Sequence, residues 1–201
     1  MKKSLNFKLK TLSIATVAVV LTSLAGCNSV GQPMARTMGM IPMGSDQDVA
    51  DADQLWAALE KENLVGSNGQ KVTPYKGVQP HGEILEFLHK NITVNGHTGL
   101  ALVKRNYRGS DVSVENVDAD RNKYLKGVTV MYKREDGYDN ENKNWFWAKY
   151  TPDGGLHVKK QMGMHIAIAG RVAKGKDEGC ISCHRAAQGG DYVFSNKISI
   201  R

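Results

Sequence analysis

The pentapeptide Cys180-Ile181-Ser182-Cys183-His184 is the feature that most limits what this chain of 201 residues can become. The C-x-x-C-H spacing is typical of c-type haem attachment, in which two thiols bond the vinyl groups and the adjacent histidine ligates the iron. The only other cysteine is Cys27, so no second pair could complete a zinc site. A thioredoxin-type dithiol would need a βαβ pattern, which is absent around this motif. The sequence therefore predicts one haem c, held by Cys180 and Cys183 and ligated by His184.

The position of the motif constrains the second axial ligand of the iron. Residues 185–201 contain neither Met nor His, so no such ligand can come from them. For every upstream candidate, an ordinary core or surface position is the simpler explanation. These candidates are Met162, Met164, His165, His157, His97, His89 and His81. We expect a mainly five-coordinate iron, with a six-coordinate electron-transfer haem as the alternative.

The first 27 residues indicate an export signal. Lys2, Lys3, Lys8 and Lys10 form a basic start, and residues 11–26 are uncharged and too short for a comfortable membrane span. Leu24-Ala25-Gly26-Cys27 looks like a bacterial lipobox, in which the cysteine carries the lipid; the alternative is an ordinary signal peptide that ends near a cysteine. Because the next residue is not Asp, we expect a lipid anchor in the outer membrane of a Gram-negative bacterium, facing the periplasm. A disulfide is conceivable in that oxidising compartment.

Composition and charge divide the chain further. We expect a signal at 1–26, a flexible tether at 27–45 and one domain at 46–201, because the tether is rich in Gly, Ser, Pro and Met. The tether methionines have no His among them, which favours a linker over a copper site. Without the four lysines of the signal the net charge falls from +7 to +3. This near-neutral domain gives no basis for nucleic-acid binding.

Hydrophobic periodicity predicts one helix followed by several strands. Residues 46–63 form an amphipathic helix capped by Ser45 or Asp46, with Val49, Ala52, Trp56, Leu59 and Asn63 on or near one stripe. Residues 66–82 indicate a loop, and 109–126 a polar excursion on the surface. The expected strands are 84–93 (whose pattern also fits a helix), 99–108, 127–133 and 144–150.

Most of the mature domain resembles the cytochrome P-460 family, which is related to the β-type cytochromes c-prime. The resemblance rests on CISCHRAAQGGDYVF at 180–194, on VTVMYKREDGYDNENKNWFWAKYTPDGGL at 128–156, and on Gly99–Tyr107 and Pro80-His81-Gly82. It covers about residues 70–196. It implies an α+β domain, in which helices pack on an antiparallel sheet and the haem lies against that sheet. The strand count from periodicity agrees with this fold class.

The resemblance also implies chemistry with small nitrogen species. Family enzymes oxidise hydroxylamine at a haem with an extra covalent bond to a lysine, whereas c-prime members bind nitric oxide at an open iron and lack that bond. Lys104 matches the lysine in the Gly99-Leu100-Ala101-Leu102-Val103-Lys104 setting; a lysine snorkelling from a strand end is the alternative. Family members are often homodimers, which leaves room for a second copy as partner. The redox partner is unknown.

One departure bears on activity. The hydroxylamine-oxidising members carry a distal carboxylate as proton acceptor, but residues 128–133 contain no Asp or Glu. Thr129 or a nearby aromatic residue is expected in that place, which would weaken N–H oxidation and leave ligand binding intact. Three hypotheses therefore stand: a site that handles hydroxylamine or a gas, an electron-transfer cytochrome with both axial positions filled, and a sensor or scavenger of nitric oxide without turnover.

Overall fold

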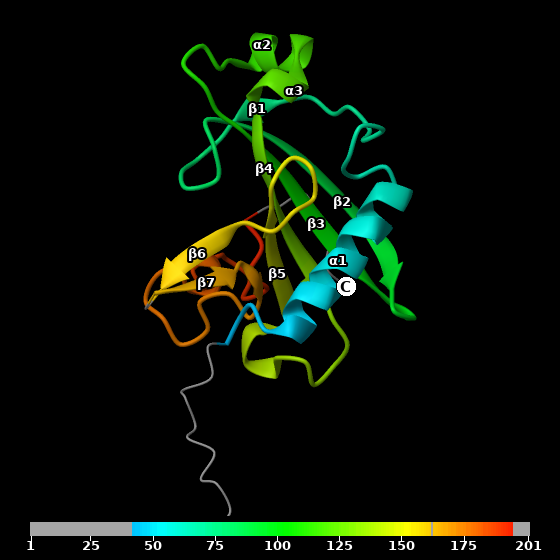
Figure 1. Ribbon diagram of the computed structural model, residues 1–201, viewed down its shortest axis with the longest axis vertical. Helices are drawn as coiled ribbons and strands as arrows, with labels where there is room; N and C mark the ends of the chain where they lie inside the picture. The colour runs from blue at the N-terminus through cyan, green and yellow to red at the C-terminus, as the bar shows by residue number, and fades with distance from the viewer. Residues whose placement is uncertain (1–41, 162, 195–201) are drawn as a thin grey trace, which may run out of the picture. The chain divides into compact units, whose positions relative to one another are not determined.

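The computed structural model describes residues 42–161 and 163–194 (Figure 1). The expected signal, the lipobox with Cys27 and most of the tether lie outside them. Within the described part, no helix has the length and apolar character needed to cross a membrane. The elements in chain order are α1 (Asp46–Lys61), β1 (Tyr75–Lys76), β2 (Ile84–Val94), β3 (His97–Tyr107), α2 (Val114–Ala119), α3 (Arg121–Tyr124), β4 (Leu125–Lys133), η1 (Asn140–Asn142), β5 (Trp145–Tyr150), β6 (Val158–Gln161), β7 (Met164–Ala167), β8 (Ala169–Gly170) and α4 (Cys180–Arg185).

The strands form a six-stranded antiparallel sheet in the order β1-β2-β3-β4-β5-β8, with β6 and β7 as a separate two-stranded hairpin. The long central strands are neighbours in the chain and pair consecutively, from Leu88 opposite Val103 to Val130 opposite Ala148. Asn95 and Gly96 take positive φ in the turn between β2 and β3, which a two-residue hairpin requires. The α+β class and the antiparallel sheet are therefore confirmed.

One face of the sheet packs against α1, which crosses strands β2 to β5 in Figure 1. Ala52, Leu55 and Leu59 of the helix are almost fully buried against this face. The sheet contributes alternate residues of each strand, as the two-residue period of a strand requires. These residues are Ala101, Val103, Val128, Val130, Tyr132, Phe146, Ala148 and Tyr150.

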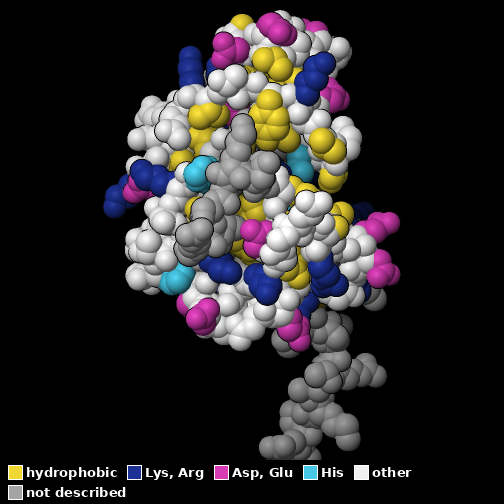
Figure 2. Space-filling model, turned by 180° about the vertical axis from the view of Figure 1, so that it is seen from behind, with side chains coloured by type: hydrophobic (Ala, Val, Ile, Leu, Met, Phe, Trp, Pro, Cys, Tyr) yellow, Lys and Arg dark blue, Asp and Glu magenta, His cyan; other side chains and the backbone are white. Residues whose placement is uncertain are grey.

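The opposite face of the sheet uses the intervening residues and packs against the C-terminal part of the chain. Leu102, Met131, Trp145 and Trp147 belong to this second core. Their partners are Met43, Ile166, Val172, Ile181, Tyr192 and Val193. Figure 2 shows the molecule from this side, with hydrophobic side chains and histidines at the surface. Because both faces are covered, β5 is apolar except at Lys149 and carries aromatic residues on both faces, as its sequence predicts.

The N-terminal helix agrees with the prediction and refines it. Ser45 caps α1 and shares a capping box with Asp48, and the helix ends at Lys61. Asn63 lies beyond the helix with a positive φ of 56°, so its predicted place on the apolar stripe is wrong. Leu55 is a buried residue of the helix that the prediction missed. Met43 pairs with Gly170, and Gly44 donates a hydrogen bond to the Ala169 carbonyl. The last residues of the expected tether therefore join the sheet.

A buried ionic cluster holds the loops at one end of the sheet. Glu86 has no exposed surface and accepts hydrogen bonds from Arg105 (3.0 Å), from Arg121 (2.7 Å) and from the Tyr107 hydroxyl. Arg105 also donates to the Leu64 carbonyl at 2.8 Å, and Arg121 to the Val72 carbonyl at 3.1 Å. One carboxylate thus fixes two arginines, and these fix the segment between α1 and β1.

Some regions hold more structure than the sequence pattern predicts, among them the expected loop at 66–82, which contains the two-residue strand β1. The polar excursion at 109–126 contains the short helices α2 and α3, which bury Val117 and Tyr124 in a small core. The β6–β7 hairpin was not predicted, because its strands are short and mostly exposed.

Candidate haem site

The C-x-x-C-H motif forms α4, a six-residue helix that brings its three functional residues to one side. In an α-helix, residues three and four apart are neighbours, which places Cys180, Cys183 and His184 together. Ile181 points into the second core with no exposed surface and anchors the helix to the sheet. The two cysteines form no disulfide; Cys180 is partly buried and Cys183 is exposed. Burial raises the pKa of the Cys180 thiol to about 11.

The segment after the motif fixes the imidazole of His184. His184 is 7% exposed, and its Nδ1 lies 2.7 Å from the backbone carbonyl oxygen of Tyr192. A carbonyl oxygen only accepts, so Nδ1 carries the proton and Nε2 keeps its lone pair for a metal. Burial lowers the pKa of His184, and the positive charge of Lys104 lowers this pKa further. The hydrogen bond to the Tyr192 carbonyl raises the pKa but does not outweigh these two effects.

Aromatic side chains surround this imidazole. The ring centroids of Trp147 and Phe194 lie 4.9 Å and 5.3 Å from that of His184, both near edge-to-face. The indole Nε1 of Trp145 donates to the Asp191 carbonyl at 2.9 Å, which ties the last described residues to β5. The indole Nε1 of Trp147 is buried and finds no hydrogen-bond partner within residues 42–161 and 163–194.

Lys104 lies on the sheet face that carries this site. It pairs directly with Thr129 on β4 and with Phe87 on β2, and it shares its face with Leu102 of the second core. Burial lowers the pKa of Lys104. Among the described residues, no carboxylate forms an ion pair with it. Lys104 stands opposite Thr129, whose hydroxyl contacts His81, and the His81 ring lies near that of His184, so the three side chains share one site.

His81 comes to the same place from the loop between β1 and β2. Its ring centroid lies 6.0 Å from that of His184, with the two ring planes perpendicular. Its Nδ1 lies 3.2 Å from the hydroxyl oxygen of Thr129. Burial, and then the charges of Lys104, His184, Lys149 and Arg108, lower the pKa of His81 to about 4. His81 is therefore neutral at physiological pH.

The other predicted candidates for the second axial position lie elsewhere. His97 bonds the Lys133 carbonyl (3.1 Å) on the α1 side of the sheet. His89, Met164 and His165 are exposed on strands. The ring of His157 packs against Gly127 on β4, and its Nε2 is buried there. Met162 lies outside the described residues. Of these seven candidates, only His81 is placed beside His184 by the described structure.

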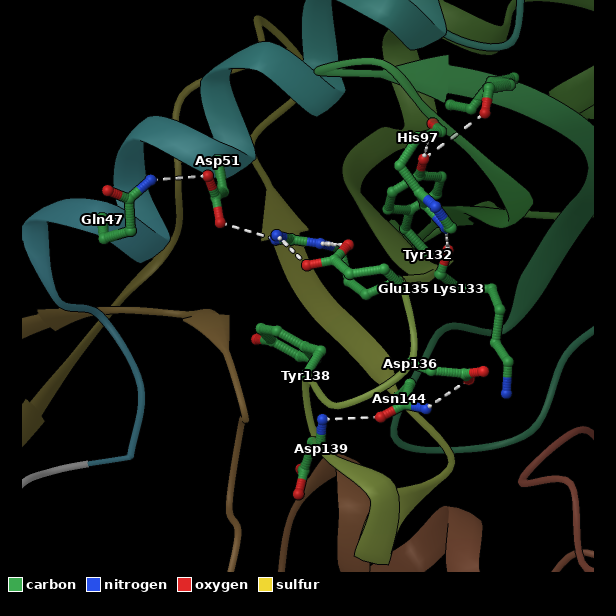
Figure 3. Close-up of polar contacts among 12 residues, drawn as sticks. Gln47, Asp51, His97, Tyr132, Lys133, Glu135, Asp136, Tyr138, Asp139 and Asn144 are labelled. Atoms are coloured by element: carbon green, nitrogen blue, oxygen red, sulfur yellow. Dashed lines mark hydrogen bonds and ion pairs between the residues drawn. The ribbon is translucent and has the colours of Figure 1, made fainter.

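A separate cavity of about 360 Å³ lies on the α1 side, and Figure 3 shows its polar surroundings. Its charged lining is already paired, because Arg134 donates to Asp51 (2.7 Å) and to both carboxylate oxygens of Glu135 (2.9 Å each). This network joins α1 to the end of β4. It leaves no unpaired group on Arg134 for a ligand, so we assign the cavity no function.

The residues of the α4 site fit a haem. Covalent haem attachment uses two thiols and a histidine ligand, and the site offers two unpaired thiols one helical turn apart and an imidazole with a free Nε2 among aromatic side chains. The partnerless Trp147 Nε1 and the unpaired Lys104 belong to the same face and are polar groups that a bound group could satisfy. In the described part of the chain, His, Cys, Asp and Glu form no cluster of three that could hold a bare metal ion.

Sequence reasoning missed two contributors to this site. The Tyr192 carbonyl fixes the tautomer of His184, but a backbone carbonyl leaves no residue-type signal. The Thr129–His81 contact joins residues 48 positions apart. Thr129 was expected in the distal pocket and His81 was one of seven candidates, but only folding reveals that they touch.

Comparison with known protein families matches residues 87–195 to the family described as Cytochrome P460, which is more than half of the chain. The match begins in β2, after His81 and its loop, and includes Lys104, Thr129 and the whole haem motif. No curated protein and no solved structure matches significantly. The α4 motif, the sheet behind it and this match lead to one conclusion: the chain belongs to the cytochrome P460 family and is a cytochrome that binds haem c.

Proposed function

We propose that this protein is an exported, lipid-anchored monohaem cytochrome that binds or oxidises small nitrogen species, such as nitric oxide or hydroxylamine, at its haem iron. The observation that carries the proposal is the position of Lys104 on the sheet face beside His184. A neutral His184 would ligate the iron from one side. The ligand would bind on the other side, next to residues of the sheet.

Each residue has a defined task in this proposal. Cys180 and Cys183 would hold the haem by thioether bonds, and His184 would ligate its iron through Nε2. The haem supplies a redox-active iron with a ligand position and, if Lys104 is bonded to it, an altered electronic structure. The Tyr192 carbonyl keeps the proton on His184 Nδ1 and thereby strengthens Nε2 as a donor.

The groups beside the iron favour binding over oxidation. Oxidation of an N–H bond needs a nearby proton acceptor, and β4 contains no carboxylate from Leu125 to Lys133. Thr129 occupies the middle of that strand opposite Lys104, and a hydroxyl is a poor base. The oxidising role would fall to another group at the site, whereas nitric oxide binding needs none.

The test is an absorption spectrum of the purified haem protein before and after addition of nitric oxide and carbon monoxide. Binding of either to the reduced protein supports the proposal. Turnover of hydroxylamine with an electron acceptor would add the oxidising role. A reduced haem that remains unchanged by both gases would refute the proposal and leave electron transfer as the better function.

Electron transfer is the second candidate, and one observation favours it. His81 lies beside His184, at the position where it could fill the remaining axial site. A haem with two strong protein ligands exchanges electrons without binding substrate.

The cellular setting completes the proposal. A lipid on Cys27 would hold the domain at the outer membrane, facing the periplasm, and two or more acyl chains would make that attachment stable. The redox partner would be a periplasmic or membrane protein, and the chain would act alone or as a homodimer.

A further inference from the structure

Two imidazoles meet at the haem site, and their separation is specific. The centroids of His81 and His184 lie 6.0 Å apart with perpendicular ring planes. With metal–nitrogen bonds of about 2.0–2.1 Å and a centroid about 1 Å beyond each nitrogen, two imidazoles on one metal have centroids roughly 6 Å apart. A histidine that only donates a hydrogen bond to an iron-bound ligand would have to lie farther from the proximal ring.

Both imidazoles are also tied through the same ring nitrogen. His184 Nδ1 bonds the Tyr192 carbonyl and His81 Nδ1 bonds the Thr129 hydroxyl. In each ring the atom that remains for a metal is Nε2. A hydrogen bond at the other nitrogen is the usual means of orienting a histidine ligand and setting its tautomer.

The hydroxyl that holds His81 is itself anchored. The side-chain amide of Asn106 lies 3.5 Å from Thr129 Oγ1 and donates toward it. Asn106 is 3% exposed, and its Oδ1 has no hydrogen-bond partner in the described part of the chain. A Thr129–Asn106 pair on adjacent strands thus supports His81 from the rigid sheet.

The loop that carries His81 is closed but lies at the edge of the sheet. Gly77 donates to the Glu83 carbonyl at 2.7 Å, and Arg108 donates to the Pro80 carbonyl. Gly77 is required because a Cβ there would lie 2.3 Å from the Gly82 carbonyl oxygen. The loop joins β2 to β1, an edge strand of two exposed residues. Such an edge opens more easily than the central strands do.

We propose that His81 is the sixth ligand of the haem iron in the resting ferric protein, so that an incoming nitrogen ligand must displace it. The inference rests on the proposed function, because displacement requires an exogenous ligand, and it adds a regulation of access to the site. It opposes the five-coordinate iron expected from the sequence. The site is therefore closed at rest and opens when the loop from Gly77 to Glu83 moves away.

The experiment compares the wild-type haem protein with His81→Ala and with a matched control, His89→Ala, whose side chain is exposed on β2. We expect a low-spin ferric spectrum in the wild type and the control, and a high-spin spectrum in His81→Ala that returns to low spin with added imidazole. Cyanide should bind the ferric His81→Ala protein with an apparent affinity roughly tenfold or more above that of the ferric wild type. The reason is that the apparent affinity is reduced to the fraction of the protein whose iron position is open.

Near-infrared magnetic circular dichroism of the wild type gives an answer even if the variant fails to attach haem, because it separates bis-histidine from histidine–lysine and histidine–methionine ligation. A bis-histidine band supports the inference. A high-spin wild type, a histidine–lysine band that would assign Lys104, or a low-spin spectrum unchanged by His81→Ala overturns it. The proposed function fails separately, if the reduced wild type binds neither nitric oxide nor carbon monoxide.

Discussion

Lys104 and Thr129 stand directly opposite each other on β3 and β4, on the sheet face that carries the haem site. Directly opposed side chains in an antiparallel pair are close neighbours, about 4.5–5.5 Å apart at their Cβ atoms. A change at Thr129 therefore places a new group beside both Lys104 and His81.

Thr129→Glu should introduce the missing proton acceptor and raise hydroxylamine oxidation by about tenfold or more at equal haem content, since general bases contribute roughly 10²–10⁴-fold. Steady-state oxidation with an artificial electron acceptor measures the rate. Thr98→Glu, on an exposed position of β3, is the control. Equal rates in Thr129→Glu and the wild type would show that the residue does not face the reacting nitrogen.

Lys104→Ala tests the covalent bond to the haem that the family resemblance implies. A bond from Lys104 to the porphyrin disturbs its conjugation, so we expect the wild-type spectrum to lie to the red of an ordinary c-type spectrum and the variant to restore the ordinary one. The intact mass of the wild type should also lack the few hydrogens that the extra bond removes. Lys159→Ala, on exposed β6, should leave spectrum and mass deficit unchanged. An ordinary spectrum in the wild type would mean that the bond is absent.

In the Lys104→Ala background, which removes the expected lysine bond, replacing Cys180 and Cys183 by Ala should abolish covalent haem, because the predicted thioether bonds are then its only covalent attachment. The measurement is haem staining after denaturing electrophoresis. Cys27→Ser is the matched control, since it removes a cysteine outside the motif and should keep the stain. A stained band in the combined variant would refute the assignment of both thiols.

Cys27→Ser should instead change where the protein is found. Without the acylated thiol the domain loses its anchor and should move from the membrane fraction to the soluble periplasmic fraction. Fractionation and incorporation of labelled palmitate provide the two measurements. If variant and parent partition alike and the parent takes up no label, the lipobox interpretation is wrong.

Glu86→Gln should destabilise the fold strongly, because it leaves Arg105 and Arg121 without the carboxylate that both contact. Breaking a buried ion pair typically costs about 3–5 kcal/mol. Urea unfolding of the haem protein, followed by far-ultraviolet circular dichroism, measures the loss. Glu62→Gln is the control, since Glu62 pairs with exposed Lys90 and should cost less than about 1 kcal/mol. Similar losses in the two variants would contradict a special role for Glu86.

The elements that sequence predicts well are those with a strong local pattern. The start of α1 at its Ser45 cap and β5 with its aromatic residues on both faces are set by neighbouring residues. By contrast, β6 and β7 are mostly exposed and carry no hydrophobic alternation, so periodicity has nothing to detect. The motif likewise predicts Cys180, Cys183 and His184 as the haem residues from its local spacing, and that assignment stays a prediction.

The remaining parts of the site depend on contacts distant in the sequence. Tyr192 adopts a positive φ of 68°, which its residue type does not indicate. The carbonyl of this same residue accepts the hydrogen bond from His184 Nδ1. From the sequence, His81 is one of seven candidates for the second axial ligand, because the residue type alone does not show which side chain its loop brings near His184. Its contact with Thr129 arises from the pairing of β2, β3 and β4, which local sequence does not specify.

The two-sided burial of the sheet limits how this domain can vary in length during evolution. Side chains alternate between the α1 core and the haem site along β3, so a one-residue insertion before Val103 would move Lys104 into the helix core and Val103 into the haem site. The same holds for Thr129 on β4 and Trp147 on β5. Length changes among related domains should therefore be confined to connections such as the β3–β4 connection around α2, where no residue of either face is displaced.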